Sequence, residues 1–215
     1  MKKSTLIFAA VLAISFCAMV MNQLRHGGSA DSGDSFATMG RMAAEQTALL
    51  LNNHGRIAIL TGSGKRPGDP LKGPVLSSFR SALPHGISVI SADADQPAIG
   101  LMGASFEQLL DFINKYPNAD AIVAFVGLPA VSDAELQRLP AQRPKIACYY
   151  ASVPAKSLFV NNIVQVAIGP SSSTRSEDAQ RLTGRAWFNT QFVVVTAKSA
   201  DSLPGSSAPK SPPVE

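Results

Sequence analysis

Six short apolar runs alternate with amphipathic stretches between residues 36 and 198. Each run is rich in β-branched residues and is almost continuously apolar, which is typical of strands that are covered on both faces. We therefore predict strands at residues 56–62, 87–93, 121–127, 145–150, 163–169 and 192–197.

Helical patterns fill the intervals between these runs. The first helix is predicted to begin after Asp34 or Ser35 and to end at Gly55 as its C-cap. A second amphipathic stretch covers residues 75–83 and ends before a proline. Three further helices are predicted from capping boxes, in which a Ser or Thr precedes a Gln or Glu by three residues. These boxes begin at Ser105, Ser132 and Thr174.

The alternation of strands and helices predicts repeated βαβ units with right-handed crossovers. Such units wind into an α/β fold. We expect a three-layer α/β/α sandwich around a mostly parallel, Rossmann-like sheet of about six strands.

The first thirty residues have the pattern of an export segment. Lys2 and Lys3 precede an uncharged run over residues 4–24, which is long enough to cross ~30 Å of hydrocarbon as a helix. The charges place the N-terminus in the cytoplasm and the rest of the chain outside it. A signal peptide cleaved before Asp31, after small residues, is the alternative, and lipidation at Cys17 is a third, less favoured one.

These patterns divide the chain into three parts. Residues 1–30 are the membrane anchor or signal peptide, and residues 31–198 are the folded domain. Residues 199–215, rich in Pro and Ser, are expected to form a disordered tail. Each alternative for the N-terminus predicts an extracytoplasmic domain, either anchored to the inner membrane or secreted.

Composition excludes several classes of function. With 46% hydrophobic and 16% charged residues, the chain is not disordered as a whole. The net charge of +4 comes mainly from three basic residues before residue 31, which leaves 16 basic and 15 acidic residues in the rest. The domain therefore has no basic stripe for nucleic acid. Two cysteines and three histidines do not form a disulfide framework or a metal centre, and we expect no cofactor.

Several segments carry a resemblance to a known family. Residues 40–45 (GRMAAE) and 55–62 (GRIAILTG) are similar to the helix and following strand that join the lobes of type 1 periplasmic binding proteins. The likeness continues through residues 79–83, 114–122 and 192–196, so that it spans nearly the whole domain. It implies the scaffold of one lobe plus the crossover helix, and a solute-binding, sugar-binding-like role.

Two departures from that family concern its ligand positions. Gly127-Leu128-Pro129 stands where sugar-binding members have an Asn-Asp pair, and Tyr149-Tyr150 stands where they have an Asp. We therefore transfer no binding residue from the resemblance.

Ligands of open α/β sheets bind beyond the carboxyl ends of the strands, which selects the candidate site. The Gly-rich turn after the first strand lacks the P-loop pattern, but its two basic side chains could bind an anion. The turn after the second strand carries two acidic side chains. They could accept hydrogen bonds from the hydroxyls of a ligand, or from the backbone of the turn itself. Alternation sends the two tyrosines to opposite faces, one toward a pocket and one into packing. The candidate ligand-binding residues are Ser63, Lys65, Arg66, Asp93, Asp95, Tyr149 and Tyr150.

No nucleophile and base occur at a spacing that marks catalysis, and we predict that the chain is not an enzyme. The leading hypothesis is a membrane-tethered extracytoplasmic module that binds a small molecule. The alternative is a structural or assembly component of a cell-envelope complex that binds a protein partner.

A single lobe also raises the question of self-association. Apolar residues that would serve a second lobe must fold back onto the one sheet or be covered in a homodimer. These residues are Met39, Met42, Leu49, Val193 and Val195.

Overall fold

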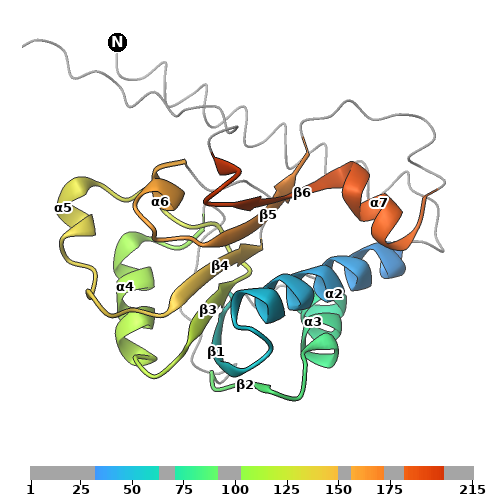
Figure 1. Ribbon diagram of the computed structural model, residues 1–215, viewed down its shortest axis with the longest axis horizontal. Coiled ribbons are helices and arrows are strands. Elements are labelled where there is room, and N and C mark those ends of the chain that lie inside the picture. The colour runs from blue at the N-terminus through green and yellow to red at the C-terminus, as the bar shows by residue number, and fades with distance from the viewer. Residues whose placement is uncertain (1–31, 63–70, 92–102, 150–155, 172–181, 201–215) are drawn as a thin grey trace, which may run out of the picture.

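A computed structural model describes residues 32–62, 71–91, 103–149, 156–171 and 182–200 (Figure 1). The predicted anchor and the part of the predicted tail beyond residue 200 lie outside these residues. Ser199 forms a turn with Thr196, and Ala200 is buried against the core, so the described fold extends to Ala200.

The fold is built on one six-stranded sheet with the strand order β2-β1-β3-β4-β5-β6. The first five strands are parallel, and β6 runs antiparallel to β5. All six strands predicted from the apolar runs are present; each is shorter than predicted, and β1 and β5 each extend one residue beyond the predicted range at one end. They are β1 (Gly55–Leu60), β2 (Ile87–Val89), β3 (Ala121–Ala124), β4 (Lys145–Tyr149), β5 (Val166–Pro170) and β6 (Phe192–Thr196).

Helices cover both faces of the sheet, which confirms the predicted three-layer sandwich (Figure 1). The first face carries α2 (Ser32–Leu50), η1 (Leu71–Val75), α3 (Leu76–Ala82) and α7 (Gly184–Gln191). The second face carries α4 (Phe106–Lys115), α5 (Asp133–Leu136) and α6 (Lys156–Val160).

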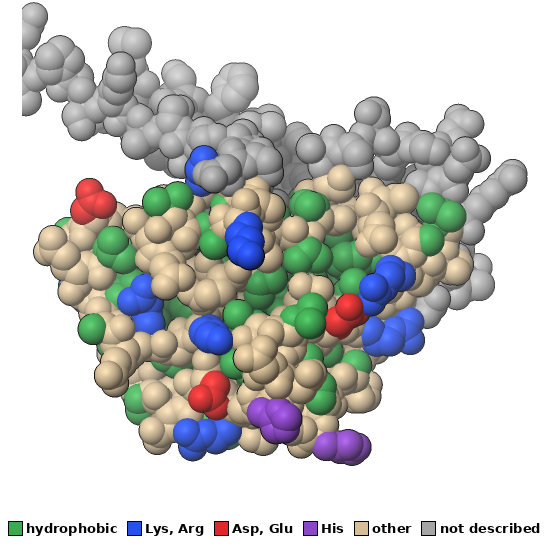
Figure 2. Space-filling model, viewed as in Figure 1, with side chains coloured by type: hydrophobic (Ala, Val, Ile, Leu, Met, Phe, Trp, Pro, Cys, Tyr) green, Lys and Arg blue, Asp and Glu red, His purple; other side chains and the backbone are tan. Residues whose placement is uncertain are grey.

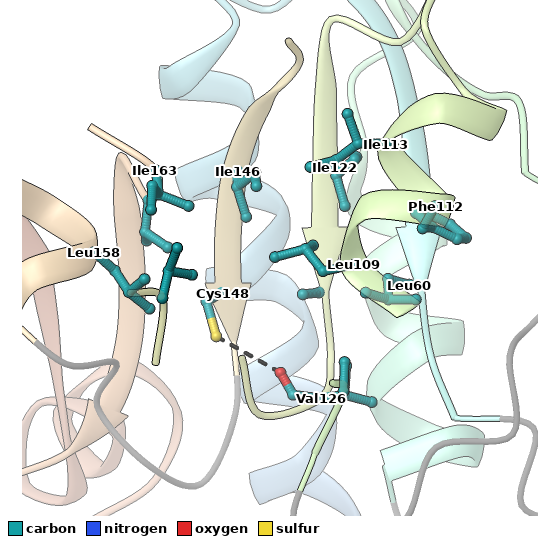
Figure 3. Close-up of a cluster of buried hydrophobic side chains, with 14 of the residues drawn as sticks. Leu60, Leu109, Phe112, Ile113, Ile122, Val126, Ile146, Cys148, Leu158 and Ile163 are labelled. Atoms are coloured by element: carbon teal, nitrogen blue, oxygen red, sulfur yellow. Dashed lines mark hydrogen bonds between the residues drawn. The ribbon is translucent and has the colours of Figure 1, made fainter. Parts of the chain in front are cut away.

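The core on the second face shows why these elements associate (Figure 3). Leu109 and Ile113 of α4 lie against Ile122 of β3 and Ile146 of β4, and all four are at most 2% exposed. Burying each such side chain contributes roughly 1.5–3 kcal/mol. The amphipathic period of α4 therefore places this helix on the sheet.

The C-terminus of α2 differs from the prediction. Gly55 is not the C-cap but the first residue of β1. The helix ends at Leu50, and the turn that closes it contains Asn52 and Asn53, which have φ values of 52° and 64°. The Asn53 N–H donates to the Ala48 carbonyl at 2.8 Å, in a Schellman arrangement. Asparagine enters this left-handed region more readily than most residues, so it replaces glycine here.

Two of the three predicted capping boxes are confirmed. Ser105 and Ser132 each accept a hydrogen bond from the backbone N–H three residues later, and the Gln108 and Glu135 side chains accept one in return. Thr174 lies outside the described residues. Two helices were not predicted: α6 has only five residues, and α7 has no side-chain cap.

Of the two alternatives for the five apolar residues of α2 and β6, burial within the single chain holds for three. Met39, Met42 and Val195 are at most 8% exposed, whereas Leu49 and Val193 remain 63% and 41% exposed. The absence of a side chain at Gly40 allows α2 to lie close to η1, because a Cβ there would lie 2.3 Å from the Val75 carbonyl oxygen.

The outer edge of β6 is closed at both ends. The Phe192 N–H donates to Phe188 in α7, and the Thr196 N–H donates to the Ser199 hydroxyl at 2.9 Å. Such capping shortens the edge that is open to strand addition.

Candidate functional site

The carboxyl ends of β1 to β5 meet at one edge of the sheet, here called the carboxyl edge. Its described residues are 61–62, 90–91, 103–105, 125–131 and 170–171. The strand order changes direction between β1 and β3, and this switch point is where open α/β sheets hold their ligands.

Ser91 determines where β2 leaves the sheet. Its hydroxyl oxygen accepts the Ile59 N–H at 2.8 Å, and the hydroxyl lies 3.4 Å from the Ile59 carbonyl oxygen, to which it donates. The side chain thus takes the place of a peptide group of β2 beside β1. Strand pairing ends there, and β1 continues to the carboxyl edge without β2.

The residues that lead into α4 lie close to the segment that follows β3. The Ala104 N–H donates to the Gly127 carbonyl at 2.9 Å, and Gly103 has a φ of 98°. A Cβ at Gly103 would lie 2.5 Å from the Gly127 carbonyl oxygen, so a larger residue does not fit without movement of the backbone. Glycine at position 103 therefore allows the close approach to Gly127 beside the switch point.

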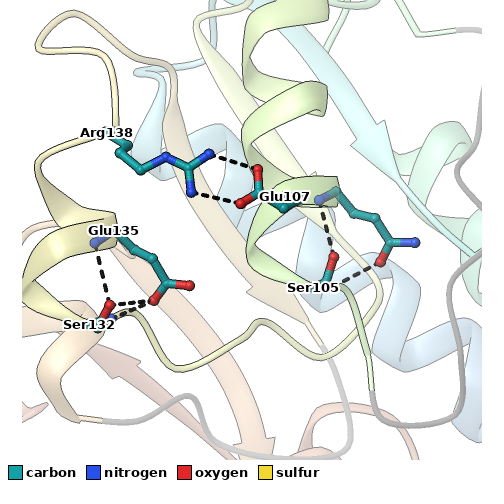
Figure 4. A network of polar contacts seen from close by, with 6 residues as sticks. Ser105, Glu107, Ser132, Glu135 and Arg138 are labelled. Carbon is teal, nitrogen blue, oxygen red and sulfur yellow. Dashed lines mark hydrogen bonds and ion pairs between the residues drawn. The ribbon is translucent and has the colours of Figure 1, made fainter.

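An ion pair connects α4 to the residue that follows α5 by two positions (Figure 4). The Arg138 guanidinium contacts both Glu107 carboxylate oxygens, at 2.7 and 2.8 Å, and lies 5.1 Å from the centre of the Phe106 ring. The hydrogen bonds from Arg138 lower the pKa of Glu107, and hydrogen bonding from Ser132 lowers the pKa of Glu135. Together with the two capping boxes, this pair connects the β3–α5 segment to α4.

The described part of the carboxyl edge is neutral and mostly apolar. It contains no acidic or basic residue, and its hydroxyls are those of Thr61, Ser91, Ser105 and Ser171. Leu128 and Pro129, which follow β3, are half-buried. Lys and Arg side chains are spread over the face in Figure 2 rather than gathered in one patch.

Of the predicted ligand-binding residues, the structure describes Tyr149. Its side chain has no exposed surface, its ring lies 5.9 Å from that of Phe125, and its hydroxyl lies 3.1 Å from Thr47 Oγ1 of α2. Burial raises the pKa of Tyr149. Tyr149 is thus the tyrosine that packs in the core. Ser63, Lys65, Arg66, Asp93, Asp95 and Tyr150 lie outside the described residues.

Cys148 is a buried thiol, as its mid-strand position predicts. It is 1% exposed, and its Sγ lies 3.7 Å from the Val126 carbonyl oxygen, to which it donates. Burial raises its pKa to about 12, so the thiol is protonated at neutral pH and is not an activated nucleophile.

Within the described residues, no group of three or more His, Cys, Asp and Glu side chains could hold a metal ion. In the same part of the chain, every helix is too short or too polar to cross a membrane.

An aromatic cluster at the far end of this edge was not assigned to the site from sequence. Trp187 and Phe188 of α7 lie 5.7 and 5.4 Å, centre to centre, from the ring of Phe192. Phe192 pairs with Pro170, the last residue of β5, so the cluster stands at the carboxyl edge. The antiparallel direction of β6 brings Trp187 to this edge.

No protein-family model matches the chain, and no curated protein matches it either. Solved structures do match. A sugar-binding protein of a sugar ABC transporter from Bacillus halodurans is 15% identical, with a TM-score of 0.51 over 78% of this chain and 64% of that one. The arabinose-binding protein AraP from Geobacillus stearothermophilus is 18% identical, with a TM-score of 0.50 over 78% of this chain and 62% of that one.

A putative LacI transcriptional regulator from Bacteroides fragilis matches similarly, at 14% identity and a TM-score of 0.50 over 79% of this chain and 62% of that one. The fold is that of the type 1 periplasmic binding proteins, over about one lobe. The resemblance predicted from sequence is therefore confirmed for the fold. The chain spans less than two thirds of the length of these neighbours.

Proposed function

We propose that this chain is a solute-binding module that holds a small molecule at the carboxyl edge and performs no reaction on it. The observation that carries the proposal is the type 1 periplasmic binding protein fold, which has a switch point between β1 and β3. The segment after β3 is held beside this point by the hydrogen bond between Ala104 and Gly127. Two neighbours are described as sugar-binding and arabinose-binding proteins. A neutral sugar is accordingly the first ligand class to test.

The chemistry of the described edge supports binding rather than catalysis. Its residues include no titratable side chain, and the nearby Cys148 thiol is protonated at neutral pH. A turnover screen of the full-length protein against hydrolase and transferase substrates is expected to find no activity. Saturable turnover that depends on residues of this edge would contradict the non-catalytic part of the proposal.

The ligand-binding part is tested by calorimetry and thermal shift with neutral monosaccharides. Saturable heat and a higher melting temperature are expected for at least one of them, because a ligand that binds only the native state stabilises it. Co-purification of one protein in fixed ratio, without binding of any small molecule, would instead support a component of an envelope complex.

We further propose that the module acts outside the cytoplasm, tethered by the apolar run over residues 4–24. Two lysines before the run support this orientation. Recovery of the full-length chain in the membrane fraction is the expected result. A mature N-terminus at Asp31 would show cleavage and release.

One lobe covers one side of a bound small molecule, whereas small-molecule sites bury about 70–90% of the ligand. We propose that a second copy of the chain or a protein partner covers the other side. Sedimentation across a hundredfold range of concentration tests self-association. A constant mass of one chain, with and without ligand, would exclude the homodimer.

A further inference from the structure

Helix α2 runs antiparallel to the parallel strands, so its two ends lie at opposite edges of the sheet. Its C-terminal end is at the amino ends of the strands, because Lys145 Nζ at the start of β4 donates to the Leu50 carbonyl at 3.0 Å. Nearer its N-terminus, Gly40 lies beside Val75 and Phe79. Val75 leads into α3, which returns from the carboxyl edge toward the start of β2. The N-terminal end of α2 therefore lies at the carboxyl edge.

The length of α2 carries this end past the sheet. Its 19 residues rise about 27 Å, whereas the six residues of β1 span about 20 Å. The N-terminal end of α2, blue in Figure 1, lies beside α7. An ion pair between Glu45 of α2 and Arg185 of α7 holds the two helices together. The point at which the chain enters the domain is thus fixed relative to the carboxyl edge.

The stretch between the apolar run and α2 is short. Residues 25–31 separate Leu24, the last residue of the run, from Ser32, the first residue of α2. Even fully extended, the chain from Leu24 to Ser32 spans at most about 28 Å. This reach limits how far Ser32 can stand from the hydrocarbon of a membrane in which the run is inserted.

This limit excludes one orientation of the domain. With α2 upright and its C-terminal end toward the membrane, the headgroup layer and the length of α2 would together place Ser32 about 33 Å or more above the hydrocarbon. That height exceeds the reach of the linker. With the N-terminal end of α2 toward the membrane, the linker spans only the headgroup layer and the gap to the domain.

We propose that the tether places the carboxyl edge on the membrane-proximal side of the domain, so that the solute site opens near the bilayer and the amino edge faces away. This inference rests on the proposed tether and the proposed solute site. The described part of the carboxyl edge offers no basic side chain to anionic headgroups, so the linker rather than lipid binding sets the orientation. A protein that covers the site must then reach it beside the bilayer.

Spin labels at the two edges test this orientation in the full-length chain, reconstituted in phosphatidylcholine vesicles. Ala130→Cys places a label on the carboxyl edge, and Asn118→Cys places one at the amino end of β3; both positions are exposed. In a Cys17→Ser background, the other thiol is the buried Cys148. A lipid that carries Ni²⁺ on its headgroup relaxes labels close to the bilayer.

We expect the Ni²⁺ lipid to raise the relaxation rate of the Ala130→Cys label severalfold more than that of the Asn118→Cys label. The two sites are separated by at least the length of β3, about 13 Å, and dipolar relaxation falls steeply with distance. Replacing part of the phosphatidylcholine by phosphatidylserine should leave the difference unchanged. Thermal melting confirms that each labelled variant is folded.

A longer linker is the matched control. Inserting about 20 Gly and Ser residues between Gly27 and Gly28 adds roughly 25 Å of average reach and leaves the anchor and the domain unaltered. Either edge can then approach the membrane, so the difference between the two labels should largely disappear.

Three results would overturn the proposal. These are equal or stronger relaxation of the Asn118→Cys label with the natural linker, a difference that survives the insertion, and a mature N-terminus at Asp31. None of them changes the calorimetry with neutral sugars. Failure of that calorimetry would reject the solute site and leave the measured orientation of the domain in place.

Discussion

The Tyr149 hydroxyl of β4 donates a hydrogen bond to Thr47 Oγ1 of α2 across 3.1 Å, between residues 102 positions apart in the chain. The direction follows from the Thr47 hydroxyl proton, which is donated to the Ala43 carbonyl at 2.9 Å. A hydroxyl has one proton, so Thr47 accepts from Tyr149. Both side chains are fully buried, and this bond joins the first helix to the centre of the sheet.

The two ends of this bond are expected to respond unequally to substitution. Tyr149→Phe leaves Thr47 with its bond to Ala43 and should lower the free energy of unfolding by about 1 kcal/mol. Thr47→Val leaves the Tyr149 hydroxyl buried without a partner and should lower the same free energy by about 1–3 kcal/mol. Urea unfolding measures both, and an equal or reversed order would contradict the assigned direction.

Gly103 is expected to be sensitive to the smallest substitution. Gly103→Ala adds a Cβ that would lie 2.5 Å from the Gly127 carbonyl oxygen, at a φ of 98°. Strain of this kind costs about 1–3 kcal/mol, read as a lower denaturation midpoint. Gly73→Ala is the matched control, because no atom lies within 4 Å of its Cβ position. Similar midpoints for the two variants would show that the Gly103–Gly127 approach is not needed.

Alkaline pH is expected to destabilise the fold through Cys148. Burial raises the pKa of this thiol from 9.0 to about 12, so the unfolded state loses its proton at a lower pH than the native state. The stabilisation is complete below pH 9 and is lost as the pH rises toward 12, with a slope of at most about 1.4 kcal/mol per pH unit.

Cys148→Ala should flatten the decline of unfolding free energy between pH 9 and pH 11, compared with wild type. Tyr149, whose pKa burial also raises, keeps part of the slope in that variant. In a Cys17→Ser background, a thiol reagent at neutral pH should react with Cys148 only after denaturant is added. Rapid labelling of the native protein would contradict its burial.

The Glu107–Arg138 pair is exposed, and its effect should appear in titration more than in stability. The Arg138 hydrogen bonds lower the Glu107 pKa below 4.5, so the contribution of the pair is present above that pH and is lost on acidification. Carboxyl titration by NMR is expected to show Glu107 below its usual range in wild type and shifted upward in Arg138→Gln. High salt should reduce the difference, because exposed charges are screened.

Much of the architecture could be predicted from local pattern. Continuous apolar runs identified all six strands, and the boxes at Ser105 and Ser132 identified the starts of α4 and α5, because a cap depends on residues three positions apart. The mid-strand position of Cys148 likewise predicted a buried thiol. In each case the deciding interaction lies within one element or follows from its burial.

The site depended on contacts that no local pattern contains. Alternation predicted that Tyr149 and Tyr150 face opposite sides of the sheet without saying which one is buried. Only the packing of α2 decided that Tyr149 is a core residue, bonded to Thr47. An apolar run also has no direction along the sheet. Only the antiparallel pairing of β6 with β5 places Phe192 beside Pro170, and with it Trp187 at the carboxyl edge. The period of apolar residues along the sequence determines which face of each helix or strand is buried. The pairing of elements that are distant in the sequence determines which side chains meet at the carboxyl edge.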